Sequence, residues 1–149
     1  MALELEYDRS LYGVEHTAGP FPVTQELILA FTRGTGETNP IFTDPDTAQA
    51  AGYTALVAPP TLCTIFVRQI KLPSIDLKFG KHSMHAGQRV QALAPIIAGD
   101  QLSASSHLKD VYAKTGRTGT MVFVVWETTF SNQEGVVVAE VEESFARRE

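Results

Sequence analysis

The chain has 149 residues, a formal net charge of −5 at pH 7 and 44% hydrophobic residues, which is the composition of an ordinary globular protein. A chain of this length is expected to form one domain, residues 1–149, whose core needs no disulfide or structural metal. Cys63 is the only cysteine, so an intrachain disulfide is excluded. The acidic charge, with no basic run larger than Arg147-Arg148, argues against a nucleic-acid surface.

The hydropathy pattern argues against a membrane partner. The longest apolar run, residues 121–126, is far too short to cross a bilayer. The acidic start, Met1-Ala2-Leu3-Glu4, is unlike a secretory signal. We therefore expect a cytoplasmic protein.

The first part of the chain has helical signals. Residues 17–23, rich in glycine and proline, are typical of a turn-rich connection. Thr24 is expected to cap an amphipathic helix that ends at Gly34.

Two more helices are expected before residue 70. Asp44 is placed as the N-cap of a short helix that Gly52 ends in a left-handed conformation. Residues 61–69 predict a further helix, and its apolar face is so wide that the helix should be buried.

From His82 onward the pattern is that of strands. Candidates cover residues 84–93, 101–112 and 118–131, and a turn at 132–135 leads into a last strand. The centre of the third candidate is apolar on both faces and must be covered on both. In the last strand Val137, Ala139, Val141 and Phe145 are expected on the buried face, and Val138, Glu140, Glu142 and Ser144 on the other. Helices followed by an antiparallel meander indicate an α+β fold.

Two blocks of this sequence resemble one known family. Residues 36–44 (Gly-Glu-Thr-Asn-Pro-Ile-Phe-Thr-Asp), with Gly52-Tyr53 and Ala58-Pro59-Pro60-Thr61, resemble the hydratase segment of MaoC-like hot-dog proteins. These proteins are (R)-specific enoyl-CoA hydratases and 3-hydroxyacyl-thioester dehydratases. Residues 85–102, opening with His-Ala-Gly-Gln-Arg, are similar to the family's next strand pair. The resemblance covers most of the chain from about Phe21. It implies a single hot-dog fold, in which an antiparallel sheet wraps around the helix at 61–69 and pairs edge to edge in a dimer.

The resemblance also assigns the catalytic positions. Active members are understood to use an Asp before the Asn-Pro, a His after it, and a backbone amide of a Gly at the start of the central helix. These positions fall on Glu37, Phe42 and Pro60. Phe42 cannot carry a proton, and loss of an acid or base costs about 10²–10⁴ in rate. Pro60 has no amide hydrogen, and loss of an oxyanion donor costs about 10²–10³.

The remaining candidates are weaker. Glu37 and His85 are possible replacement catalytic groups, although a solvated carboxylate and a scaffold histidine are the commoner roles. We expect no metal site, because no His, Cys and carboxylate spacing fits one, and no cofactor. By the same resemblance, the substrate-binding residues are expected to be Asn39, Phe42, Tyr53, Pro60 and Thr61.

These substitutions indicate a substrate-binding, non-catalytic half of an enoyl-thioester hydratase or 3-hydroxyacyl-thioester dehydratase. Some dehydratases of this family pair a catalytic hot-dog unit with one that only shapes the acyl pocket, and units of the second kind resemble this chain in Pro-Pro-Thr and His-x-Gly-Gln. The expected partners are an acyl-CoA or acyl-carrier-protein thioester and a catalytic hot-dog subunit, a second copy of the chain, or both. Three alternatives stay open: a homo-oligomeric hydratase or a thioesterase using Glu37 or His85, or a non-enzymatic acyl-CoA-binding module.

Overall fold

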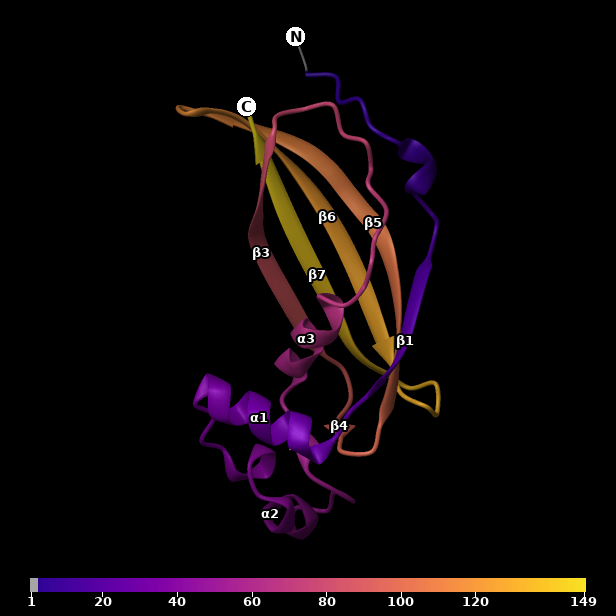
Figure 1. Ribbon diagram of the computed structural model, residues 1–149, viewed down its shortest axis with the longest axis vertical. Helices are drawn as coiled ribbons and strands as arrows, with labels where there is room; N and C mark the ends of the chain where they lie inside the picture. The colour runs from indigo at the N-terminus through magenta and orange to yellow at the C-terminus, as the bar shows by residue number, and fades with distance from the viewer. Residues whose placement is uncertain (1–2) are drawn as a thin grey trace.

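The computed structural model describes residues 3–149, so Met1 and Ala2 of the acidic start lie outside it. A five-stranded antiparallel sheet forms most of the molecule (Figure 1). Its strands, in spatial order, are β1 (His16–Pro22), β5 (Gln101–Gly116), β6 (Gly119–Ser131), β7 (Val137–Arg148) and β3 (His82–Ala92). The expected α+β class is confirmed.

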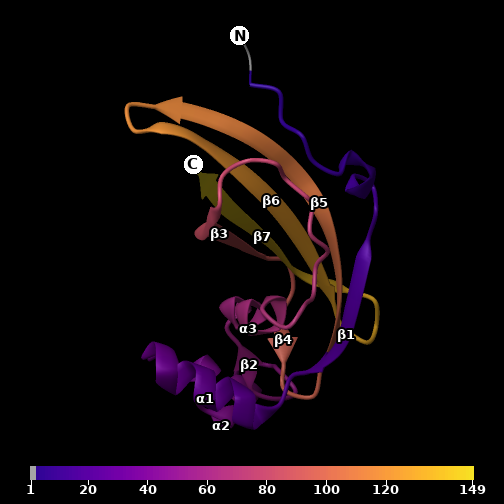
Figure 2. The same cartoon turned by 45° about the horizontal axis from the view of Figure 1, so that its top comes forward.

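The helices lie on one side of the curved sheet (Figure 2). Short 3₁₀ turns and a two-stranded sheet of β2 and β4 connect them to the strands. The bounds are η1 (Arg9–Leu11), α1 (Gln25–Thr35), η2 (Pro40–Phe42), α2 (Pro45–Ala50), β2 (Val57–Ala58), η3 (Pro60–Leu62), α3 (Cys63–Val67) and β4 (Ile96–Ile97). As expected of a hot-dog fold, the sheet bends around α3.

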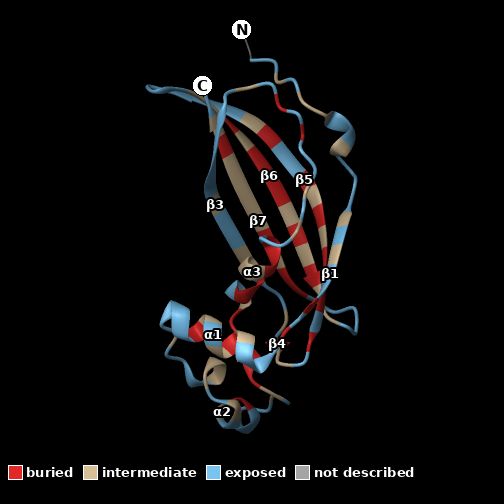
Figure 3. Ribbon diagram, viewed as in Figure 1, coloured by how far each residue is buried: buried red, intermediate tan, exposed pale blue. Residues whose placement is uncertain are grey.

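Two groups of buried side chains fill the concave side of the sheet. Around α3, the Phe66 ring stacks on Phe21 and packs against Phe130, with centroid distances of 5.1 and 6.4 Å. Farther along, the loop after α3 places Ile75 and Leu77 over the apolar residues of β6. Figure 3 shows the contrast between buried β6 and exposed β3. Of the helices formed by residues 3–149, none has the length and hydropathy that a membrane crossing requires.

The expectation of a turn-rich connection at 17–23 is wrong. Residues 17–22 lie in β1, which pairs with β5 through an irregularity between Ala18 and Phe21. Gly19 lies in this irregularity with φ +106°, and a Cβ there would come within 2.8 Å of the Leu102 carbonyl oxygen. Proline is tolerated because β1 is an edge strand, where its missing N–H removes no bond to a neighbour.

Of the expected helix ends in this region, the C-terminal end of α1 differs. Helix α1 continues through Gly34 to Thr35 and ends at Gly36, whose φ of +73° is left-handed and whose amide donates to the Thr32 carbonyl. Thr24 caps its start as expected, because its side chain accepts from the Leu27 amide. Gly52 follows α2 with φ +100°, as expected.

The central helix is shorter than the expected 61–69. Pro60 begins a 3₁₀ turn, and α3 itself covers only Cys63–Val67. After Val67, the amides of Gln69 and Ile70 bond to carbonyls three residues back, so the chain tightens into turns.

Strands β6 and β7 differ in how well their expected burial patterns match the structure. In β6, Val122, Val124 and Trp126 lie in the core on the concave face, and Val125 on the convex face is also buried. At the start of β7 the expected alternation is wrong: Val138 is fully buried, whereas Val137 is 38% exposed. The pairing register shifts between Phe130 and Ser131, which turns Val138 inward.

Candidate functional site

The loop after α1 carries three of the expected site residues. The Glu37 carboxylate Oε1 accepts hydrogen bonds from the backbone amides of Thr38 and Asn39, at 3.1 and 3.0 Å. The Asn39 side-chain oxygen in turn accepts from the Ile41 amide at 3.2 Å and caps η2. Both polar side chains therefore hold their own loop, and half-buried Phe42 ends the turn.

The second expected block lies beside this loop. Turn η2 contacts β2, the strand that runs directly into Pro59 and Pro60. Pro60 is the first residue of η3, and its missing N–H leaves no amide donor at that position. Thr61 is exposed, and its carbonyl accepts from the Thr64 hydroxyl at 2.8 Å.

Tyr53 does not lie with the Glu37 loop or with His85. It lines a separate hollow beside β4, together with Asp100 and Gln133. The Gln133 side chain donates to Asp100 there, at 3.0 Å. The structure therefore does not bring Tyr53 together with His85.

His85 lines a pocket of about 440 Å³ on the concave side of the sheet. One wall comes from the end of α3 and the loop after it, and the other from β3, β6 and β7. Its apolar lining consists of Val67, Ile70, Leu72, Trp126 and Phe145. This volume is in the range of small-molecule sites, and the lining suits an apolar ligand.

The pocket also contains a polar group. Glu143 Oε2 lies 3.0 Å from His85 Nε2 and accepts from Gln88 Nε2 at 3.3 Å. The Glu143 side chain is only 15% exposed, and two donors on one oxygen offset part of the cost of burying its charge. The His85 ring contacts the edge of Phe145, with a centroid distance of 5.4 Å.

His85 and Glu37 therefore belong to different sites. His85 is paired with Glu143 on β7, and Glu37 is bound to its own loop. Sequence reasoning missed Glu143, although a signal was present. With Ala139, Val141 and Phe145, Glu143 shares the parity of the buried face, where a charged residue is unusual.

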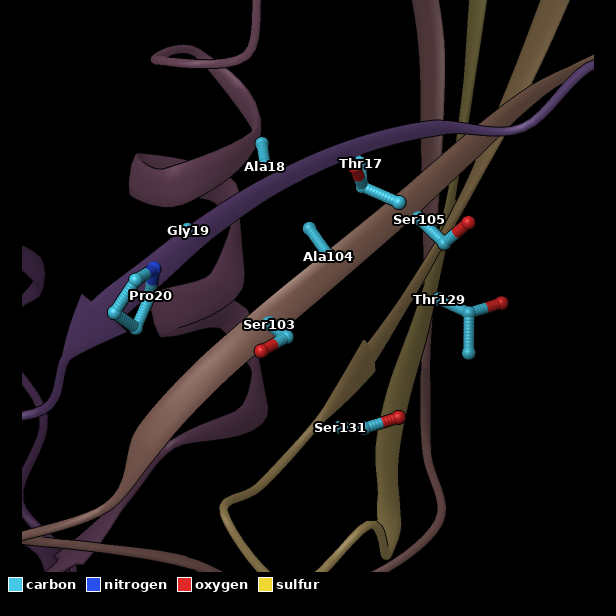
Figure 4. Close-up of a pocket in the computed structure, with 9 residues that line it drawn as sticks. All are labelled: Thr17, Ala18, Gly19, Pro20, Ser103, Ala104, Ser105, Thr129 and Ser131. Atoms are coloured by element: carbon cyan, nitrogen blue, oxygen red, sulfur yellow. The ribbon is translucent and has the colours of Figure 1, made fainter.

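A second hollow, of about 470 Å³, lies on the convex face of the sheet (Figure 4). Five hydroxyl side chains from β1, β5 and β6 line it: Thr17, Ser103, Ser105, Thr129 and Ser131. These side chains are on the opposite face of the sheet from His85 and Glu143. This groove and the concave pocket are separate sites.

Cys63 is not placed to be a nucleophile. Its side chain is fully buried, and burial raises the pKa of the thiol to about 12. Within the described part of the chain, no three His, Cys, Asp or Glu side chains come together as metal ligands.

Residues 10–141 match the family model described as "FAS1-like, dehydratase domain region". The chain belongs to this family. A UPF0336 protein of Parafrankia sp. (strain EAN1pec) is 37% identical over 125 residues, which cover 81% of this chain and 80% of the relative. These findings extend the family assignment over nearly the whole sequence.

Solved structures of dehydratases are similar to this chain in fold. The C-terminally truncated HadBC complex, a 3R-hydroxyacyl-ACP dehydratase from Mycobacterium tuberculosis, has a TM-score of 0.72 and 26% identity, covering 93% of this chain and 98% of that one. A MaoC-like dehydratase from Rhodospirillum rubrum has a TM-score of 0.68 and 19% identity, covering 93% of each chain. The resemblance to MaoC-like hot-dog hydratases and dehydratases is confirmed.

Proposed function

We propose that the chain is the substrate-binding, non-catalytic half of an (R)-specific enoyl-thioester hydratase or 3-hydroxyacyl-thioester dehydratase. It acts as one hot-dog unit, residues 1–149, that shapes the acyl pocket in the cytoplasm. A catalytic hot-dog subunit supplies the groups that move protons and stabilise the thioester oxygen. The thioester is carried on CoA or on a carrier protein.

The observation that carries this proposal is the pair Phe42 and Pro60. Adding water to an enoyl thioester needs an acid, a base and hydrogen-bond donors for the developing enolate oxygen. An aromatic ring and a proline at the family's catalytic positions provide none of these. Glu37 retains a carboxylate, but its Oε1 is occupied by two backbone amides of its own loop.

Two further features support a partner subunit. Strand β3 is the last strand of the sheet, and its outer edge pairs with no other strand of residues 3–149. An exposed edge of eleven residues is a template for pairing with another chain. The similar HadBC structure is itself that of a complex.

Reconstitution tests the proposal. The purified chain is mixed with a hot-dog subunit from the same organism that retains the Asp and the His, and hydration of enoyl-CoA and of enoyl carrier protein is assayed before and after mixing. We expect no turnover by this chain alone, and turnover on mixing that exceeds the activity of the partner alone. Strong hydration by the isolated chain, lost in Glu37→Ala, would refute the proposal.

The mixture also allows a matched control. Glu37→Gln in this chain should leave the activity of the mixture unchanged, because a Gln oxygen can still accept the two loop amides. A large loss of turnover with an intact complex would mean that Glu37 takes part in the chemistry.

A further inference from the structure

The segment that forms the open edge of the sheet is basic, although the chain as a whole is acidic. Strand β3 is the outermost strand on its side of the sheet (Figure 1). Residues 77–99, which include β3, contain none of the seventeen Asp and Glu residues of the chain. They contain three of its twelve Lys and Arg residues: Lys78, Lys81 and Arg89. Positive charge therefore gathers at an edge to which another strand can be added.

The carboxylates of the neighbouring strand β7 leave two of these cations unpaired. Glu142 faces Arg89 across the β3–β7 pair, but its Oε2 accepts from Lys109 at 2.7 Å. Glu143 Oε2 lies within hydrogen-bonding distance of two other β3 side chains. Lys81 and Arg89 are exposed, and neither forms an ion pair within residues 3–149. Their charges are available to a strand that docks beside β3.

Apolar side chains at the same edge favour a protein as the occupant. Lysine on an edge strand can serve simply to keep other strands away. However, Met84 in β3 is 44% exposed, and Leu93, directly after β3, is 47% exposed. Methionine and arginine are enriched at protein–protein interfaces, and apolar side chains beside unpaired backbone groups suit the addition of a strand.

Pairing of two copies of this chain through β3 would bring like charges together. Adjacent strands lie about 4.8 Å apart, and a two-fold pair presents the same residues on both sides. Two edges that carry Lys81 and Arg89 but no carboxylate repel each other, whereas a strand with Asp or Glu beside them is attracted. A charge pattern that favours one partner and opposes self-pairing is a source of specificity.

We propose that the β3 edge docks a partner strand that carries carboxylates, and that its positive charge disfavours pairing between two copies of this chain. The partner is the catalytic hot-dog subunit of the proposed function, on which this inference rests. The matching edge of that subunit is acidic where this one is basic. Lys81 and Arg89 then decide which subunit is accepted.

A charge-reversed copy of the chain tests this without any other protein. The double variant Lys81→Glu with Arg89→Glu has an acidic edge, so it should pair with the unmodified chain. Sedimentation equilibrium at low salt compares the unmodified chain, the variant and their equimolar mixture. We expect association in the mixture to be about tenfold tighter than in either chain alone, as for two cross-strand charge pairs changed from like to opposite sign. High salt should reduce this gain.

A matched control reverses two charges elsewhere. Arg33→Glu with Arg117→Glu makes the same change in net charge on α1 and in the β5–β6 turn, at exposed positions outside residues 77–99. Mixing this control with the unmodified chain should give no such gain. Circular dichroism and thermal unfolding establish that each variant is folded.

The catalytic subunit of the reconstitution experiment provides a second measurement. Lys81→Gln with Arg89→Gln removes both charges without adding new ones. At low salt this variant should bind the catalytic subunit about three- to tenfold more weakly than the unmodified chain does.

Three results would overturn the inference: a mixture with the folded charge-reversed variant that associates no more tightly than either chain alone, an equal gain with the control, or undiminished binding of the glutamine variant to the catalytic subunit. Charge-selective pairing without hydration would contradict the proposed function alone. Hydration on mixing, with pairing that ignores these charges, would contradict this inference alone.

Discussion

The imidazole Nε2 of His85 lies 3.0 Å from the Glu143 carboxylate, across the paired strands β3 and β7. His85 lines the pocket beside α3, whereas Glu37, the other candidate for proton transfer, is bound to the backbone of its own loop after α1. Under the proposed non-catalytic role, we expect hydration by this chain alone to require Asp, His and Gly at positions 37, 42 and 60 together.

Restoring those groups is the first prediction. The triple variant Glu37→Asp, Phe42→His and Pro60→Gly regains a carboxylate, an imidazole and an amide donor. We expect the isolated triple variant to hydrate crotonyl-CoA at least about 10²-fold faster than the unmodified chain. Phe42→His alone should raise the hydration rate little, because Pro60 still lacks the N–H that would donate to the thioester oxygen. A folded triple variant that is as inactive as the parent would show that other family groups are also missing.

The end of α1 gives a pair of predictions of opposite sign. Gly36→Ala forces a Cβ into a left-handed conformation with φ +73° and should lower the free energy of unfolding by about 1 kcal/mol. Gly34→Ala lies within the helix with no atom within 4 Å of the added Cβ, so it should raise that free energy by about 0.5–1 kcal/mol. Urea unfolding of both variants measures the difference. Destabilisation by Gly34→Ala in place of Gly36→Ala would mean that the helix ends at Gly34.

The convex face provides a prediction about pH and salt. Lys109 donates to Glu142 at 2.7 Å and to Glu127 at 2.9 Å, and these bonds raise the pKa of its ammonium group above the ordinary 10.5. A raised pKa means that the stabilisation is complete below pH 10.5 and is lost as the pH rises above it. Because Lys109 is largely exposed, Lys109→Met should lower the free energy of unfolding by only about 0.5–1 kcal/mol at low salt.

The salt dependence of unfolding tests whether the stabilisation by Lys109 comes from its ion pairs. Glu127 and Glu142 face each other across β6 and β7, so without the lysine they repel each other until salt screens them. The cost of Lys109→Met should therefore shrink in high salt. Lys114→Met is the control, because Lys114 lies over the Tyr112 and Phe123 rings, away from this carboxylate pair. A cost independent of salt would argue against the ion pairs.

Cys63 should be inert in the folded chain. Its thiol is fully buried, and desolvation raises its pKa to about 12, so almost no thiolate is present at pH 8. We expect labelling by a disulfide reagent such as DTNB to be slow in the native chain and fast in urea. Rapid stoichiometric labelling of the native chain would mean that the helix around Cys63 opens readily.

The sequence predicted the strands and the family better than it predicted the edges of elements. Gly19, Pro20 and Pro22 make residues 17–23 typical of a loop, whereas pairing with β5 holds residues 17–22 in a strand. Val137 and Val138 exchanged faces because a register shift is not visible in a period of two. Both errors come from tertiary contacts that local patterns do not contain.

The same limit applies to the site. The sequence located the loop of Glu37 and Asn39, but it could not show that their side chains are occupied by their own backbone. His85 was considered as a lone group, since its partner Glu143 is far away along the chain and becomes a neighbour only through β3–β7 pairing. The prediction that position 60 offers no amide donor could be made from the sequence alone, because proline has no amide hydrogen in any fold.

The open edge of β3 has a consequence for the fate of the protein in the cell. Its unpaired amide and carbonyl groups can pair with a strand of another molecule, so a chain synthesised in excess over its partner is prone to aggregation or proteolysis. If the proposed partner subunit covers this edge, the abundance of this chain should follow that of the partner. Balanced co-expression of the two should raise the soluble yield of both.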